Sequence, residues 1–209
     1  MRTEDLIAEL ASRAAPVRPL PSPAVRLLGW SGAALAGAGV WLSIFGTRPH
    51  VVDLFTRPDF LATAALAAAT TLCAGAASLV LAIPGAERSG VLRGAATALA
   101  ASWALLLTVA TIRAGHGLAG VVDWPICFVR VIAMALIPGI VLFAMLRRAA
   151  PLRFRWTSAL AAVAALSIAA GAIQFICPID DAGHALLGHF GPVLVGAVLG
   201  LLAARRFLK

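Results

Sequence analysis

The chain has 209 residues, of which 61% are hydrophobic and 12% charged, and its formal net charge is +8. Soluble domains usually have about 45–50% apolar and about 25% charged residues, so a soluble α/β enzyme is all but excluded, as is a disordered chain. The apolar excess indicates that lipid is the solvent.

The first 24 residues form the only sizeable polar segment. Leu6, Ile7 and Leu10 have the spacing of an apolar stripe on a helix. The proline-rich residues 16–23 cannot continue that helix and predict a stiff, extended spacer. We therefore expect a short amphipathic helix that either docks in the groove of a partner or lies on the membrane surface or the inner loops. The spacing alone leaves both alternatives open.

Six apolar stretches follow, each close to the ~20 residues that a helix needs to cross a bilayer. They cover residues 25–46, 59–83, 91–113, 125–146, 156–177 and 185–204. Sustained alternation of apolar and polar residues is missing from all of them, so a β-barrel is not expected. The predicted fold class is an all-α integral membrane protein, with a bundle of six transmembrane helices in a domain of residues 25–209.

The positive charges are distributed unevenly between the two faces of this bundle. If the N-terminus is cytoplasmic, the inner segments carry 13 of the 17 Lys and Arg residues and the outer segments carry 3. Such an imbalance predicts that both termini are cytoplasmic. We expect a multi-pass protein of a bacterial inner membrane. The net charge is then mostly a topology signal, and direct binding to nucleic acid is not expected.

Two features inside the spans have alternative interpretations. Gly196 and Gly200 form a GxxxG pattern, which favours packing within the bundle, with a homodimer as the alternative. Arg130 is the main charge at depth, and we expect it to snorkel outward or, by preference, to form a structural ion pair. Its candidate partners are Asp123, Asp180 and Asp181.

Two of the three cysteines lie at the outer boundary in this topology. Cys127 is in the first turn of the fourth span, and Cys177 ends the fifth span directly before Pro178. Cys73 lies in the middle of a span, where a small packing residue is expected. Two boundary thiols on one face favour a redox- or metal-responsive site, although the sequence does not place their Cα atoms within disulfide reach.

All four histidines fall outside the spans or at their outer rim, at His50, His116, His184 and His189. Thiolate and imidazole suit zinc, copper and similar ions. A soft metal could therefore be held by Cys127, Cys177, His184 and His189. For each histidine a solvated or hydrogen-bonded rim position is the favoured alternative, because a metal site needs ligand geometry.

Several segments resemble the NrsF-type membrane anti-sigma factors, over essentially the whole chain. The segments that carry this resemblance are Met1–Leu10, Ala15–Leu20, the Trp-x-x-Cys segment ending at Cys127, the Leu146–Arg153 loop, Cys177–Asp180 and His189–Pro192.

The resemblance implies an inner-membrane regulator, without catalysis or a cofactor, that binds an extracytoplasmic-function (ECF) sigma factor. The cytoplasmic N-terminal segment would bind the sigma factor, and Cys127 and Cys177 would sense redox stress or heavy metals and trigger its release. The residues expected to contact the sigma factor are Asp5, Leu6, Ile7 and Leu10, with inner-loop contacts from Arg147, Arg148 and Arg153.

Two other classes of protein compete with this interpretation. A membrane thiol oxidoreductase that exchanges electrons with a quinone would also use two boundary cysteines, but it usually has a reactive C-x-x-C pair, which this sequence lacks. A small transporter is weakened by the scarcity of polar residues at depth.

Overall fold

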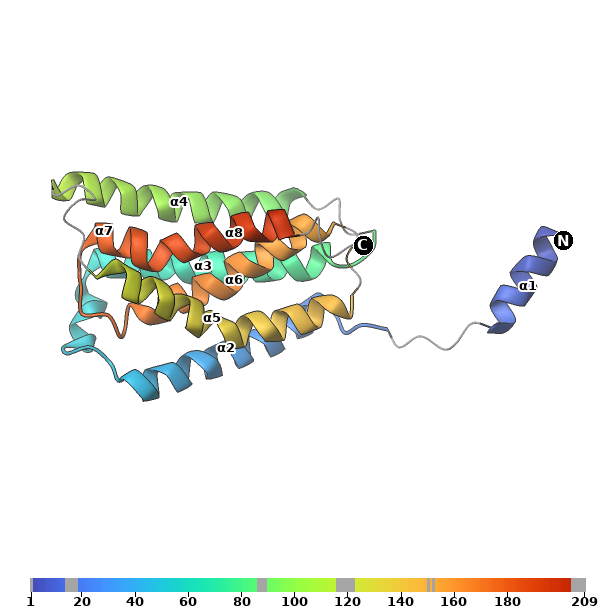
Figure 1. The fold of residues 1–209 in the computed structure, drawn as a ribbon, viewed down its shortest axis with the longest axis horizontal. Coiled ribbons are helices and arrows are strands. Elements are labelled where there is room, and N and C mark those ends of the chain that lie inside the picture. Colours follow the sequence, from blue (N-terminus) through green and yellow to red (C-terminus); the bar gives the residue numbers. More distant parts are fainter. Residues whose placement is uncertain are drawn as a thin grey trace.

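The computed structural model describes residues 2–13, 19–85, 90–115, 123–149, 151 and 153–203, and the regular elements in this part of the chain are all helical (Figure 1). In chain order they are α1 (Thr3–Arg13), α2 (Pro23–Phe45), η1 (Val51–Thr56), α3 (Pro58–Leu81), α4 (Gly90–Ala114), α5 (Trp124–Arg147), α6 (Phe154–Ile173), α7 (Ala182–His184), η3 (Ala185–Phe190) and α8 (Gly191–Ala203).

Within the described residues, six helices are long and apolar enough to cross a membrane: α2, α3, α4, α5, α6 and the joined run Ala182–Leu202. The expected all-α fold with six spans is confirmed, and the chain is a multi-pass membrane protein by this criterion. Five of the six spans agree closely with the sequence boundaries. The exception is the fifth, which ends earlier than expected.

The fifth span ends at Ile173, so the prediction that Cys177 ends this helix is wrong. The Cys177 amide donates to the Ile173 carbonyl at 2.8 Å in a closing turn, and the following proline cannot continue the helix. Cys177 therefore lies in the segment that connects α6 to α7. That next helix is capped by the Asp181 carboxylate, which accepts from the His184 amide at 2.8 Å.

The most deeply buried span is α6, which packs against α3, α5 and α8 (Figure 1). Its many alanines allow close approach of the neighbouring backbones. A Cβ atom at Gly200 of α8 would lie 2.6 Å from the Ala159 Cα of α6, and one at Gly196 would clash with the Leu166 side chain. The GxxxG pattern therefore serves packing within the bundle, which leaves it unavailable for the homodimer considered from the sequence.

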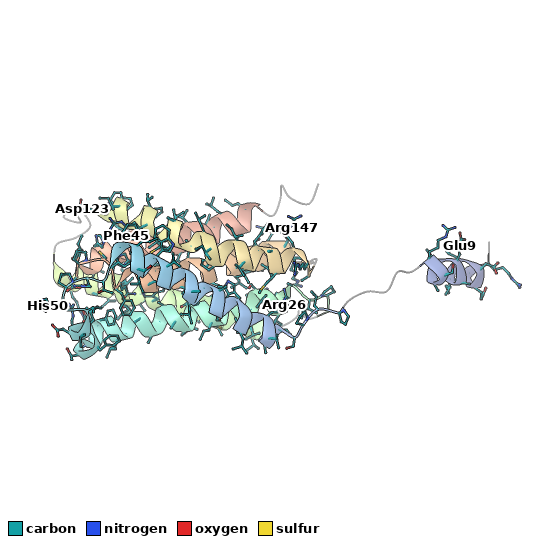
Figure 2. The ribbon with its side chains drawn as sticks, turned by 90° about the horizontal axis from the view of Figure 1, so that it is seen from below. Glu9, Arg26, Phe45, His50, Asp123 and Arg147 are labelled. Carbon is teal, nitrogen blue, oxygen red and sulfur yellow. The ribbon has the colours of Figure 1, made fainter. Side chains whose placement is uncertain are left out.

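The bundle has two ends of different character (Figure 2). At one end lie Arg26 and Arg147, near the start of α2 and the end of α5, and we call it the tail end. At the opposite end lie His50 and Asp123, and we call it the thiol end because Cys127 follows Asp123 by one helical turn. α1 precedes α2 in the chain and has no buried residue.

Hydrogen bonds attach the beginning of α2 to the second half of α5. Fully buried Trp30 donates from Nε1 to the Pro138 carbonyl at 2.9 Å. One turn earlier, the Arg26 guanidinium donates to the Met145 carbonyl at 2.8 Å. Gly75 of α3 makes room for the indole, since a Cβ there would lie 2.9 Å from the Trp30 ring. A displacement of α5 would therefore strain or break the hydrogen bonds that hold the start of α2.

Candidate functional site

The two boundary cysteines meet inside the protein at the thiol end. The Cys127 Sγ lies 3.6 Å from the Cys177 Sγ, and the two residues are only 4% and 2% exposed. Both are free thiols. The sequence predicts that they lie on the same face of the membrane, and the structure brings them into contact, with Cys127 on α5 and Cys177 in the segment that connects α6 to α7.

Two histidines complete this group. The His184 Nε2 lies 3.4 Å from the Cys177 Sγ, and the His184 and His189 rings meet edge to face with centroids 5.2 Å apart. The ligand atoms of Cys127, Cys177, His184 and His189 all lie within 4.8 Å of one another, and all four residues are buried. We call these four residues the thiol–imidazole cluster.

The favoured interpretation of the histidines was a solvated or hydrogen-bonded rim position. A solvated position is wrong for His184 and His189, which are 0% and 4% exposed, whereas the contact of His184 with the Cys177 Sγ fits the hydrogen-bonded alternative. A solvated position fits His50, whose side chain is 85% exposed. His116 lies outside the described residues.

A π-helical turn over Ala185–Phe190 positions the second histidine. Residues five apart on a regular α-helix point about 140° away from each other. The wider π turn, which bonds residue i to residue i+5, brings His189 back toward the face that carries His184. Pro192 lacks the N–H that would close an α-helical bond to the Gly188 carbonyl, which favours this local change.

Glycine allows the π turn to approach α5 directly. A Cβ atom at Gly188 would lie 3.1 Å from the Trp124 carbonyl oxygen and 3.3 Å from the Cys127 Cβ. The first turn of α5 thus packs against the backbone of the π turn. This close approach puts Cys127 beside the histidine pair.

The thiol pair is electrostatically asymmetric. The hydrogen bond from the Cys127 thiol lowers the pKa of Cys177 against the opposing effect of burial, and the contact with His184 lowers it further. Cys177 is therefore the sulfur of the pair that more readily becomes a thiolate, the form that attacks oxidants and binds metals.

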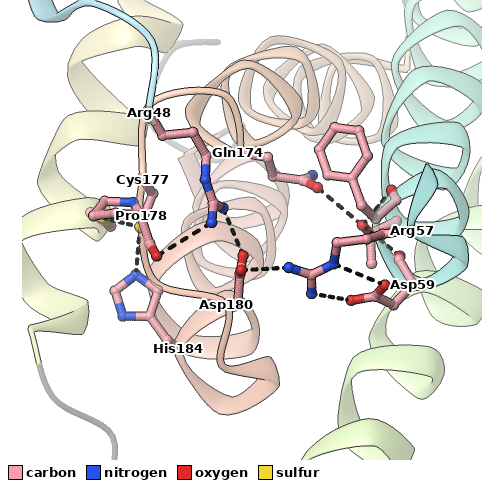
Figure 3. A network of polar contacts seen from close by, with 11 residues as sticks. Arg48, Arg57, Asp59, Gln174, Cys177, Pro178, Asp180 and His184 are labelled. Carbon is pink, nitrogen blue, oxygen red and sulfur yellow. Dashed lines mark hydrogen bonds and ion pairs between the residues drawn. The ribbon is translucent and has the colours of Figure 1, made fainter. Parts of the chain in front are cut away.

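A partly exposed ion-pair network stabilises the segment between α6 and α7 that carries Cys177 (Figure 3). Asp180 accepts from Arg48 at 2.7 Å and also from Arg57, which in turn donates to Asp59 at 2.7 Å. Arg48 and then Arg57 lower the pKa of Asp180, so its carboxylate stays charged at neutral pH. The Arg48 amide also donates to the Phe175 carbonyl at 2.9 Å. The segment between α2 and α3 thus fixes the loop that carries Cys177.

A cavity of about 160 Å³ lies between this network and the thiol–imidazole cluster. Its wall includes Cys177 and His189 on one side and Arg57, Asp59 and Asp180 on the other. Because the Asp180 and Arg57 side chains are 40% and 36% exposed, the cavity connects the cluster with the outer surface of the thiol end.

The expected ion pair of Arg130 is not formed by the described residues. Its guanidinium instead lies over the Phe45 ring, 5.1 Å from the centroid. Asp180 is engaged by other arginines and Asp181 caps a helix, so two of the candidate partners have other roles. A cation–π contact satisfies this charge at the membrane boundary.

The residues proposed for sigma-factor contact lie apart from the cluster. Leu6, Ile7 and Leu10 are 41%, 61% and 62% exposed on α1, and the Asp5 carboxylate accepts from the Arg2 amide at 3.3 Å. The loop arginines are at the tail end: Arg147 lies over the Phe143 ring in the last turn of α5, Arg148 follows that helix and Arg153 precedes α6.

The sequence model of the NrsF family, described as negative regulator of sigma F, matches residues 10–209. The matched region includes the thiol–imidazole cluster and the loop arginines and begins at Leu10, after most of α1. No curated protein and no solved structure shows a significant match to the chain.

Proposed function

The chain belongs to the NrsF family, and we propose that it is a membrane-bound anti-sigma factor that holds an ECF sigma factor through its N-terminal segment, residues 1–24. The observation that carries this proposal is the family match over nearly the whole chain, whose description as a negative regulator of sigma F supports an anti-sigma role. A regulatory rather than a catalytic role agrees with that description.

The exposed apolar face of α1 supports its role as the sigma-binding element. The leucine and isoleucine side chains of α1 are exposed. Burial of one such side chain against a partner contributes about 1.5–3 kcal/mol to the free energy of binding. We propose that Leu6, Ile7 and Leu10 insert into a groove of the sigma factor and that Asp5 lies at its edge. Arg147, Arg148 and Arg153 would add contacts from the tail end of the bundle.

We propose a bacterial inner-membrane location with the tail end in the cytoplasm and the thiol end facing the periplasm. The excess of positive charge in the segments of the tail end supports this orientation. It puts the N-terminal segment in the compartment of the sigma factor and the cysteines in an oxidising one.

We propose that Cys127 and Cys177 sense redox stress or soft metals. Hydrogen peroxide, as a representative oxidant, takes one electron and one proton from each thiol, its O–O bond breaks to give two water molecules, and an S–S bond forms. The 3.6 Å separation of the sulfurs and the lowered pKa of Cys177 support this chemistry. A soft cation would instead bind the sulfurs as thiolates.

The signal would travel along α5. Cys127 is in the first turn of this helix, and the carbonyls of Pro138 and Met145 farther along accept hydrogen bonds from Trp30 and Arg26 of α2. A new bond at Cys127 would shift the first turn of α5, and α2 would pass the shift to the N-terminal segment that precedes it. Such a switch needs a signal that interacts differently with the two states.

Co-purification of the cognate ECF sigma factor with the full-length chain in detergent tests the central part of this proposal. We expect the sigma factor to co-elute with the wild-type chain and to be lost when residues 2–13 are removed. Equal recovery with and without these residues would contradict the assignment of the N-terminal segment.

A further inference from the structure

We propose that four buried side chains at the thiol end bind one soft metal cation of the Zn²⁺ or Cd²⁺ type as a tetrahedral site: Cys127, Cys177, His184 and His189. This inference rests on the proposed sensing role and deepens it, because it names the two histidines as ligands and a metal ion as what the cluster binds. Metal binding itself does not depend on a sigma factor and is tested separately from it.

The distances within the cluster fit this geometry. Zinc–sulfur and zinc–nitrogen bonds of about 2.3 Å and about 2.0 Å in a tetrahedron separate two sulfurs by about 3.8 Å and a sulfur from a nitrogen by about 3.5 Å. The observed separations are 3.6 Å between the Cys127 and Cys177 sulfurs and 3.4 Å between the Cys177 sulfur and the His184 Nε2. All four ligand atoms lie within 4.8 Å of one another, which is about 1 Å more than the sulfur–sulfur separation in such a tetrahedron.

His189 is difficult to explain by packing alone. It is only 4% exposed, and neither of its ring nitrogens makes a hydrogen bond of standard geometry with a described residue, although its ring lies beside the Cys177 thiol and the His184 ring. A buried polar group without a good hydrogen-bond partner destabilises the fold. A metal ion bound by one of these nitrogens would remove part of that destabilisation.

The backbone is shaped to hold this set of ligands. The π turn directs His184 and His189 toward the same side, and Gly188 lets α5 bring Cys127 against them. Asp181 fixes the start of this segment by accepting from the His184 amide. Because π turns are rare and often occur at functional sites, the local structure supports a binding role.

The cavity of about 160 Å³ gives a cation access from the outer surface, since Cys177 and His189 both line it. Asp59, Asp180 and Asp181 in the same wall outnumber its two arginines and favour a cation over an anion. Two thiolates and two imidazoles would select zinc-like and cadmium-like ions over magnesium or calcium, which prefer oxygen ligands.

The test uses the full-length chain, purified under reducing conditions and freed of metal, with Co²⁺ and Cd²⁺ as probes. We expect one ion per chain, visible bands of tetrahedral Co²⁺ and an ultraviolet thiolate-to-Cd²⁺ charge-transfer band. His184→Gln and His189→Gln should each weaken binding at least about 100-fold, because loss of a group that only hydrogen-bonds a metal ligand already costs about 10–100-fold. His50→Gln, an exposed histidine of the same end, is the matched control and should bind like the wild type.

A substitution could also weaken metal binding by destabilising the fold. The change in Tm on addition of metal, measured for each variant, separates the two effects. Metal should raise the Tm of the wild type and of His50→Gln, whereas the Tm of each cluster variant should hardly respond. No binding by the wild type, or unchanged affinity and spectra in both cluster histidine variants, would overturn the four-ligand site. In the latter case the cysteines would bind metal without the histidines, and their proposed sensing role would stand.

Discussion

The thiol end and α1 differ in whether their side chains are buried by other parts of the same chain. At the thiol end, four reactive side chains are buried against one another, and the loop that carries Cys177 is fixed by ion pairs. On α1 none of the eleven residues is buried, and its three largest apolar side chains are all exposed. One region has its partners within the fold, whereas the other presents a surface for a partner.

This difference suggests how sensing and output are divided in the molecule. A small ion or oxidant needs only a preformed cluster of a few atoms, which one bundle provides. A sigma factor needs an accessible apolar surface, which a helix outside the bundle provides. The α2–α5 hydrogen bonds connect the helix that follows the N-terminal segment with the helix that carries Cys127.

The largest effect is expected from charges on the apolar face of α1. Leu6→Asp combined with Leu10→Asp should remove about 3 kcal/mol or more of the binding free energy that the two buried side chains contribute. Sigma-factor binding should therefore weaken about 100-fold or more. Binding is measured with purified components, and constitutive activity of a sigma-dependent reporter is expected in cells. Ala8→Asp puts a charge on the opposite face and should leave binding close to wild type. Retained affinity in the leucine variant would rule out this face.

The next effect concerns the response to stress. Cys127→Ser with Cys177→Ser should reduce induction of the reporter by oxidant or cadmium to about the uninduced level, because oxygen neither forms the disulfide nor binds soft metals well. Cys73→Ser is the matched control, since Cys73 lies in the middle of α3 away from the pair. Normal induction in the double variant would show that sensing lies elsewhere.

A smaller effect is expected from a change in the hydrogen bond between Trp30 of α2 and Pro138 of α5. Trp30→Phe keeps a large ring but removes the donor to the Pro138 carbonyl. A neutral hydrogen bond is worth about 0.5–1.5 kcal/mol, so sigma release by oxidant should weaken by up to about tenfold. Trp41→Phe is the control, because its indole nitrogen has no hydrogen-bond partner in the described part of the chain. Equal effects of the two substitutions would argue against signal transfer through this bond.

The smallest effect is expected from Asp180→Asn, which removes the ion pairs that fix the Cys177 loop. Such exposed pairs are worth about 0–1 kcal/mol, so alkylation of Cys177 as the sole cysteine should speed up by at most about fivefold. The pKa of Asp180 is lowered, so the stabilisation is complete above the usual aspartate pKa and is lost only as pH falls through the lowered value. The ratio of the Cys177 alkylation rate in Asp180→Asn to the rate in the protein with Asp180 intact should therefore stay constant from mildly acidic to neutral pH.

Asp53→Asn changes an exposed carboxylate of the same end and serves as the control for that experiment. Its alkylation rate at Cys177 should match that of the protein with Asp53 intact. An Asp180→Asn rate equal to the Asp53→Asn rate would mean that the network does not restrain the loop.

The sequence was sufficient for the six spans and for placing both cysteines on one face, because apolar length and loop charge act locally. It did not predict that Cys177 lies beyond its helix or that two rim histidines are buried. The burial of the histidines depends on tertiary contact, because the π turn needs Gly188 against α5. The contact of Arg130 with Phe45 likewise joins two helices that are distant in the sequence. The helix end before Cys177 is instead a local effect of Pro178. Pro192, directly after Gly191 and four residues after Gly188, was the signal in the sequence that could have indicated an irregular turn at His189.

The central claim is that the state of the two thiols controls how tightly the N-terminal segment holds a sigma factor. The most direct measurement is the affinity of the full-length chain, in lipid nanodiscs, for its cognate sigma factor before and after peroxide oxidation. We expect oxidation to weaken binding by the wild type at least about tenfold, a coupling of about 1.4 kcal/mol, and to leave the Cys127→Ser, Cys177→Ser variant unchanged. Equal affinities of the reduced and oxidised wild-type chain would contradict the account.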